Sequence, residues 1–168
     1  MPINEAHAKI CCMMAKKFRL DKLLLLAMIQ VESAGDEKAY RFEPEFWQKY
    51  LANNPEWMDR NPKEVSASYG LMQLMYTTAA MLGFTGDGAL LYDPVINIEL
   101  GAKLLRRNLD QLKDIKNKKL WPMDIAIARY NGGTWRNPDK AGDLRMQDYV
   151  DLVKAAYWKV RKEVRECD

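Results

Sequence analysis

Residues 23–33 read LLLLAMIQVES, and this stretch decides the fold. Asp21 stands before it as a typical N-cap residue, and Gly35 follows it as a residue suited to ending a helix. The helix predicted over about 21–33 is apolar almost all round. Such a helix usually lies in the middle of a domain, and we expect this one to do so.

Most of the remaining chain carries helical periodicity or helix boundary signals. No convincing strand run is present, and a short hairpin near 64–70 stays open as an alternative. The sequence therefore predicts an all-α, mainly helical fold in a single domain over 1–168. Besides 21–33, the expected helices are 4–17, one after Pro44, one after Pro55, 73–82, 94–115, 122–131 and 146–164.

The composition is that of an ordinary globular protein, with 48% apolar and 29% charged residues. The net charge of +3 leans weakly towards anionic partners. Because the basic residues are spread along the chain rather than concentrated, we expect no nucleic-acid partner. Nothing in the sequence indicates an obligate oligomer, and a monomer is expected.

The three cysteines are Cys11, Cys12 and Cys167, and their spacing fits no metal site. We expect free thiols, with a bridge from Cys167 to the first helix as the alternative. His7 is the only histidine, which argues against a histidine-based triad or a zinc site. No cofactor and no metal are expected.

The N-terminal residues MPINEAHAKI do not resemble a signal peptide, because they lack a basic start and an apolar core. The longest apolar run, Leu23–Ile29, is far shorter than the roughly 20 residues of a membrane span. We expect no integral membrane segment. Two alternatives stay open: a leader has already been removed, or the chain leaves the cytoplasm by another route.

Glu32 is the first residue with a chemical role to consider. It closes a strongly apolar helix, where burial and the negative end of the helix dipole both raise a carboxyl pKa. A carboxylic acid that stays protonated near neutral pH can donate a proton to a leaving oxygen. The structural alternative is an exposed glutamate, or one paired with an arginine.

Two further segments gather polar and flexible residues. In Tyr69-Gly70-Leu71-Met72-Gln73-Leu74-Met75, the glycine permits close approach of a ligand and the glutamine can both donate and accept hydrogen bonds. In Ala128-Arg129-Tyr130-Asn131-Gly132-Gly133, a phenol and an amide stand at a turn. Taken alone, the first is typical of a helix start with core methionines and the second of a helix C-cap.

Taken together and in order, these segments form a pattern. Its parts are Glu32-Ser33, the Gly70–Met75 string, Asn97-x3-Gly101, Ile127–Gly133 and Asp148-Tyr149-Val150. From about Leu24 to Tyr157 the chain resembles the soluble (Slt-type) lytic transglycosylases, relatives of goose-type lysozyme. The Gly-Leu-Met-Gln-Leu-Met string is the most specific element.

The resemblance implies a lysozyme-like helical domain with a substrate groove that binds peptidoglycan. Glu32 matches the family's catalytic acid, which protonates the glycosidic oxygen and then deprotonates the muramic 6-hydroxyl, so that a 1,6-anhydro sugar forms without water. Ser33 matches a mainly structural serine beside the acid. The resemblance places these candidates along the groove: Ser33, Ser68, Tyr69, Gly70, Gln73, Met75, Tyr130, Asn131 and Tyr149.

The chain departs from the family pattern in two places. Glu32 and Gln73 are 41 residues apart, wider than the family's spacing, so the aromatic-rich segment at about 36–66 looks like an insertion. The family also keeps a serine before its Gly-Leu-Met-Gln string. Ser66 and Ser68 are both candidates for it, and neither is in perfect register.

The insertion carries Glu43, which could act as a second carboxylate of the kind a hydrolase needs. The alternative is that Glu43 caps the helix that starts at Pro44. Trp47, Tyr50 and Trp57 could stack on sugar faces, or form the small core of the inserted segment.

Three functions follow. The first is a lytic transglycosylase. The second is a hydrolytic muramidase that uses Glu32 with a second carboxylate, such as Glu43 or an acid near it. The third is a non-catalytic component of a phage tail or secretion machine, which the retained Glu32 argues against.

Overall fold

The computed structural model describes residues 4–112, 121–132 and 144–164. The chain divides into two compact units, which are described separately. Unit 1 joins residues 1–31 to 102–168, and unit 2 is the continuous stretch 32–101. The expectation of a single domain stays a prediction.

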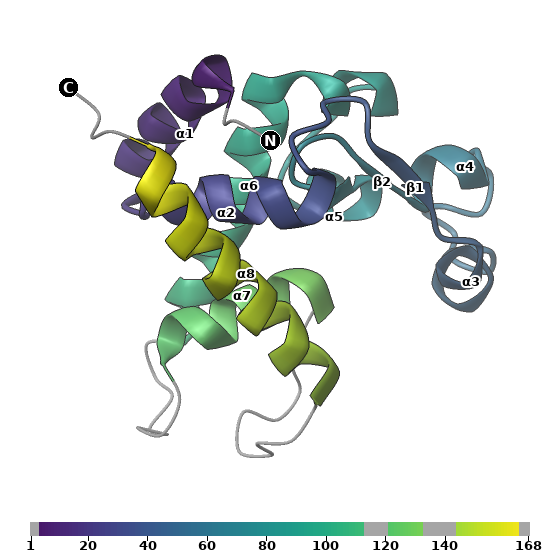
Figure 1. Cartoon of the computed structure of the whole chain (residues 1–168). Helices are drawn as coiled ribbons and strands as arrows, with labels where there is room; N and C mark the ends of the chain where they lie inside the picture. Colours follow the sequence, from purple (N-terminus) through teal and green to yellow (C-terminus); the bar gives the residue numbers. More distant parts are fainter. Residues whose placement is uncertain (1–3, 113–120, 133–143, 165–168) are drawn as a thin grey trace. The chain divides into compact units, whose positions relative to one another are not determined.

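Helices dominate both units, as the sequence predicts (Figure 1). The elements in chain order are α1 (Glu5–Phe18), α2 (Lys22–Ser33), β1 (Tyr40–Phe42), α3 (Pro44–Phe46), the π-helix η1 (Trp47–Leu51), α4 (Pro62–Val65), β2 (Ala67–Tyr69), β3 (Leu74–Met75), α5 (Tyr76–Met81), the 3₁₀ helix η2 (Gly88–Tyr92), α6 (Pro94–Asp110), α7 (Pro122–Gly132) and α8 (Leu144–Glu163).

The core of unit 1 includes the apolar helix α2. Asp21 caps it as predicted, because its Oδ1 accepts the Leu23 N–H at 2.7 Å. All of Leu24–Ile29 is buried, which confirms the expected central helix. α7 and α8 lie side by side in the same unit, and Lys154 Nζ contacts Asp124 Oδ2 at 3.0 Å between them.

Unit 2 contains a small antiparallel sheet in the order β1-β2-β3. Tyr40 lies opposite Tyr69, and Ser68 lies opposite Met75. The expectation of no convincing strand run was wrong, whereas the alternative of a short hairpin near 64–70 was partly right, because β2 lies there and pairs with β3. Strands of two or three residues are too short to show the alternation by which a strand is recognised in sequence.

Two helix predictions in unit 2 need correction. The helix expected over 73–82 begins only at Tyr76, because Leu74 and Met75 pair with β2. The helix expected after Pro55 is absent, and residues 55–60 form turns instead. Asn54 Oδ1 accepts the Glu56 N–H at 2.9 Å, so the asparagine side chain stabilises a turn there.

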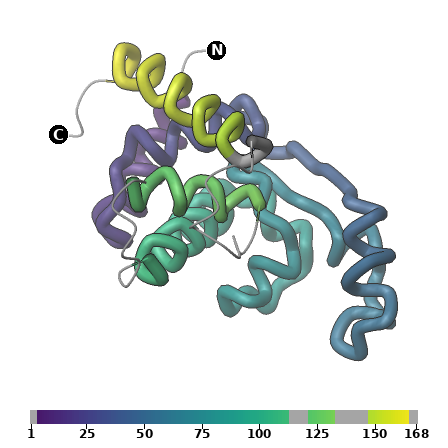
Figure 2. Tube along the Cα trace, turned by 90° about the horizontal axis from the view of Figure 1, so that it is seen from below, coloured from purple at the N-terminus to yellow at the C-terminus, as the bar shows by residue number. Residues whose placement is uncertain are grey.

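The inserted segment 36–66 is well structured. β1 and β2 lie side by side, and the chain between them folds into α3, η1 and α4 at one end of this ribbon (Figures 1 and 2). The Trp57 ring meets the Tyr76 ring edge-on at 6.2 Å. Trp57 is half-buried and its ring partner belongs to α5, whereas Tyr50 is 54% exposed. Stacking of these rings on sugars stays a prediction.

The cysteines of α1 differ from each other. Cys11 is a buried free thiol, as predicted, but Cys12 is disulfide-bonded, so the expectation of a free thiol was wrong for Cys12. Cys167 lies outside the described residues. Within the described part of the chain, no helix combines the length and the apolar character that a membrane crossing requires.

Candidate functional site

Glu32 lies in the last turn of α2 and is half-buried. The helix ends one residue later, at Ser33, because Ala34 and Gly35 both take positive φ values, of 53° and 84°. This confirms Gly35 as a residue that ends the helix. Glu32 thus stands where an apolar helix gives way to a sharp turn.

Ser33 connects this end of α2 to the Gly70–Met75 loop. Its Oγ donates a hydrogen bond to the Leu71 carbonyl oxygen at 2.8 Å, and accepts one from the Gly35 N–H at 3.2 Å. Because Glu32 is the adjacent residue, this hydroxyl fixes the backbone beside the candidate acid against the loop. The contact supports the structural role expected for Ser33.

Asn97 holds the same loop from α6. Its side chain is fully buried and uses both ends of its amide: Nδ2 donates to the carbonyl oxygens of Tyr69 and Leu91, and Oδ1 accepts the Met72 N–H, each at 2.8 Å. A buried amide with all these partners fixes the backbone around it, since a broken bond would leave a polar group unpaired.

Gly70 is required where it stands. Its φ is +66°, and an added Cβ would lie 2.7 Å from Asn97 Nδ2 and from the Leu91 carbonyl oxygen. Gly70 permits a close approach, as expected. The groups that approach it are Asn97 and Leu91 of the protein itself, whereas the expectation was a ligand.

Gln73 closes the loop in a strained conformation, with a φ of +43° that is uncommon outside glycine. Its Nε2 donates to the carbonyl oxygens of Ala39, at 3.2 Å, and Gly70, at 3.1 Å. These bonds orient the side-chain amide and leave Oε1 as the atom it can offer to a ligand. Contact between Gln73 and a substrate stays a prediction.

Ser68 and Tyr69 are buried in β2, with exposed fractions of 3% and 4%. The Tyr69 hydroxyl donates to the Glu64 carbonyl oxygen at 2.8 Å. Burial, with smaller contributions from Tyr40 and Glu64, raises the pKa of Tyr69, so its phenol stays protonated. Ser68 and Tyr69 lie opposite Met75 and Leu74 in the sheet, and their contact with substrate stays a prediction. Met75 is half-buried.

Glu43 occupies the N-cap position of α3, but its side chain makes no capping hydrogen bond. Glu43 therefore has the N-cap position that the alternative expected, but it does not cap the helix through its side chain. Its Oε1 pairs with Arg41 Nε, and its carbonyl oxygen accepts a hydrogen bond from Ser66 Oγ. The carboxylate is one-third exposed, at 33%, and its role as a second groove carboxylate stays a prediction.

The other three candidates belong to unit 1. Tyr130 is half-buried and Asn131 exposed near the end of α7, and Tyr149 is buried in α8. Gly133 lies outside the described residues. The groove roles of these three residues stay predictions. Among the described residues, no cluster of three or more histidine, cysteine, aspartate or glutamate side chains could hold a metal ion.

Sequence reasoning missed the roles of three residues around the loop. Asn97 entered only as part of a motif, although an asparagine between Ile96 and Ile98 in an amphipathic helix is a signal of a buried polar contact. Glu64 and Tyr76 carried no such signal, because their partners are distant in sequence.

Comparison with known proteins identifies the family of this chain. A family model described as Transglycosylase SLT domain matches residues 10–149. The chain belongs to this family. That confirms the resemblance and the lysozyme-like, mainly helical fold expected from it. A relative from Enterobacteria phage PRD1, described as "Transglycosylase", is 33% identical over 143 residues, covering 82% of this chain. The chain spans 40% of the length of that relative.

Proposed function

We propose that this SLT-domain protein cleaves the β-1,4 bond between N-acetylmuramic acid and N-acetylglucosamine in peptidoglycan, and that it leaves 1,6-anhydromuramic ends. It acts at the cell wall or in the periplasm, as a monomer, without a metal or cofactor. Family membership supports the substrate class and the bond type. The anhydro product and the roles of individual residues go beyond what family membership supports.

One observation carries the assignment of Glu32. The Ser33 hydroxyl donates to the Leu71 carbonyl at 2.8 Å, so the backbone that holds Glu32 is tied to the loop that holds Gln73. A general acid must be held within hydrogen-bond reach of its substrate oxygen, and a short tether between acid and binding loop serves that requirement.

The chemistry assigned to Glu32 has two proton transfers. Glu32 first gives its proton to the glycosidic oxygen as the bond from that oxygen to C1 breaks. The carboxylate then takes the proton of the muramic 6-hydroxyl while the 6-oxygen bonds to C1. The carboxyl group ends as it began and no water is consumed, so this route needs no second protein carboxylate.

The test is mass spectrometry of the muropeptides that the protein releases from purified peptidoglycan. Anhydro ends would support the transglycosylase. Reducing muramic ends, one water heavier, would overturn the proposed product. An absence of soluble fragments would overturn the enzymatic assignment and favour a non-catalytic component of a phage tail or secretion machine.

A second candidate is a hydrolytic muramidase in which Glu43 positions the attacking water. It is favoured by the side chain of Glu43, which is partly exposed and does not cap α3. Hydrolysis by paired carboxylates requires such a second group. The same mass spectra separate the two candidates, because only hydrolysis adds water to the muramic end.

A further inference from the structure

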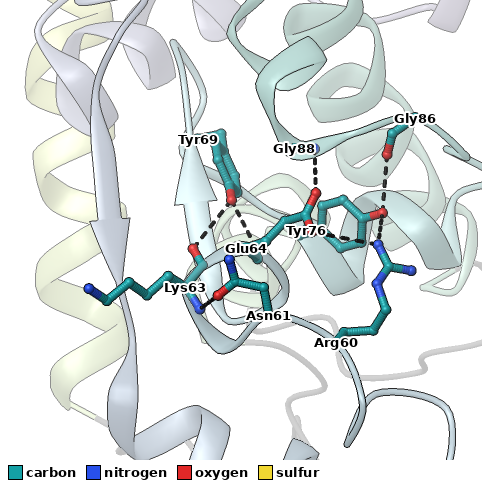
Figure 3. A network of polar contacts seen from close by, with 8 residues as sticks. All are labelled: Arg60, Asn61, Lys63, Glu64, Tyr69, Tyr76, Gly86 and Gly88. Carbon is teal, nitrogen blue, oxygen red and sulfur yellow. Dashed lines mark hydrogen bonds and ion pairs between the residues drawn. The ribbon is translucent and has the colours of Figure 1, made fainter.

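Two tyrosines flank the Gly70–Met75 loop, and both hydroxyls are held by residues outside it. Tyr69 directly precedes Gly70, and Tyr76 directly follows Met75. The Tyr69 hydroxyl reaches the inserted segment, and the Tyr76 hydroxyl lies between Arg60 and Gly86 (Figure 3). The two ends of the loop therefore enter one network of polar contacts.

Glu64 is the residue that joins the parts of this network. Its Oε1 accepts the Gly88 N–H at 3.0 Å, and its Oε2 lies 3.7 Å from Arg60 Nη2. Its backbone carbonyl accepts the Tyr69 hydroxyl at 2.8 Å. Figure 3 shows the Glu64 side chain between Tyr69, Gly88 and Tyr76.

Arg60 carries the network to the far end of the loop. Its Nη2 donates to the Tyr76 hydroxyl at 3.0 Å, and its guanidinium lies 5.5 Å from the centre of the Tyr76 ring. The Tyr76 hydroxyl in turn donates to the Gly86 carbonyl oxygen at 3.1 Å. The start of α5 is thus held by the same segment that holds Tyr69.

A third connection runs through η2. Glu64 caps this short helix at Gly88, and the Leu91 carbonyl in the helix accepts from Asn97 and lies against Gly70. Gly88 admits no side chain, because a Cβ there would lie 2.8 Å from the Tyr69 hydroxyl. The contacts around Glu64 therefore reach the two residues that flank the loop, Tyr69 and Tyr76. Through η2 they also reach Gly70 within the loop.

We infer that Glu64 is a positioning residue for the Gly70–Met75 loop, and through the loop sets the affinity for the glycan strand. This inference rests on the proposed function, and it deepens it by giving the inserted segment a role in the reaction. The Glu64 side chain acts through Gly88 and Arg60, whereas its backbone carbonyl holds Tyr69. Glu64 makes no contact with the reacting atoms.

Hydrogen exchange tests the positioning independently of activity. The reporters are the Gly70, Met72 and Gln73 amides, which donate to Ala39, Asn97 and Gly70 respectively. We expect Glu64→Ala to speed their exchange about fivefold or more, because the side-chain contacts with the Gly88 N–H and with Arg60 are lost together. Glu56→Ala is the matched control, since Glu56 is an exposed carboxylate of the same segment, and its exchange should equal that of the parent protein.

Two further variants keep the test decisive if Glu64→Ala fails to fold. Glu64→Gln retains an oxygen for the Gly88 N–H, so we expect most of the protection to return. Tyr76→Phe removes the hydroxyl that links Arg60 to Gly86. In combination with Glu64→Gln, its effect should be non-additive, because both residues belong to one network.

Kinetics on purified peptidoglycan strands complete the test. We expect Glu64→Ala to raise KM about fivefold while kcat stays within about twofold, because a displaced loop weakens the binding of the substrate and of the transition state equally. Unchanged exchange at the loop amides would overturn the inference, as would faster exchange with unchanged KM. A parent protein without any cleavage would overturn the proposed function instead, while the exchange data would still decide the positioning.

Discussion

Gly70 and Asn97 form a contact that leaves no room for a side chain on the glycine. A methyl group on Gly70 would lie 2.7 Å from Asn97 Nδ2 and as close to the Leu91 carbonyl oxygen. Those two atoms are hydrogen-bonded to each other at 2.8 Å. The glycine and the asparagine therefore specify one loop conformation together.

Gly70→Ala should lower the free energy of unfolding by about 3 kcal/mol, from strain at positive φ plus the forced displacement of Asn97. Gly35→Ala is the control: its φ is also positive, at +84°, but nothing lies within 4 Å of an added Cβ, so it should lose only about 1 kcal/mol. Urea denaturation of both variants measures the difference. Equal losses of unfolding free energy would mean that Asn97 can shift to accommodate the added methyl group at little cost.

Ser33→Ala should reduce stability by about 1 kcal/mol, because it removes the hydroxyl that donates to Leu71. It should also lower kcat more than it raises KM, because the acid beside it loses its fixed position. Steady-state kinetics on peptidoglycan check this. Thr85→Ala, at an exposed threonine, serves as the control, and a Ser33→Ala enzyme of normal kcat would contradict the tether.

Glu32→Gln should leave the fold intact and reduce cleavage at least about a hundredfold, because an amide cannot supply the proton. Circular dichroism checks the fold, and release of soluble muropeptides checks the activity. Near-normal turnover by a folded Glu32→Gln protein would refute the assignment of the acid.

Glu43→Gln should reduce activity more than Glu45→Gln does. Glu43 is partly exposed and paired with Arg41, whereas Glu45 is exposed in the first turn of α3. Both changes remove one negative charge, at positions two residues apart. A difference between them therefore comes from where the carboxylate lies and not from the loss of charge itself. Equal and small effects would remove Glu43 from the proposed groove.

Cys11 should make stability fall in alkaline solution. Burial raises the pKa of its thiol to about 12, from 9.0. Because the folded pKa is the higher one, this stabilisation is complete below about pH 9 and is lost from there towards about pH 12, at about 1.4 kcal/mol per pH unit. Denaturation curves from pH 7 to 11 should show a shallower decline for Cys11→Ala. Parallel declines would show that the thiol does not cause the effect.

The sequence specified most helices because their signals are local. Asp21 and Gly35 mark the ends of α2, and the Asp93-Pro94 pair marks the start of α6, where Asp93 Oδ1 accepts the Val95 N–H at 2.8 Å. Glu32 and the loop were found through their motifs. These features depend on neighbours a few residues away, which a single sequence displays.

The sequence did not specify features that depend on distant partners. The pairing of Phe42 with Ala67 in the sheet, and the contact of Glu64 with Gly88, each join residues separated by more than twenty positions. The ion pair of Glu43 with Arg41 is local, but it competes with a capping role that the sequence supports equally well. Only three-dimensional packing decides between such alternatives.

The division of the chain has a consequence for the order of events on the ribosome. Unit 2 is continuous from 32 to 101, whereas unit 1 needs residues from both ends of the chain. Because synthesis proceeds from the N-terminus, the contacts of Ser33, Glu64 and Asn97 can all form before the last third of the chain emerges. Unit 1, which contains α2 up to Val31, cannot be completed until residues from 102 onwards have been made, so newly made chains should be most exposed to aggregation and proteolysis in that interval.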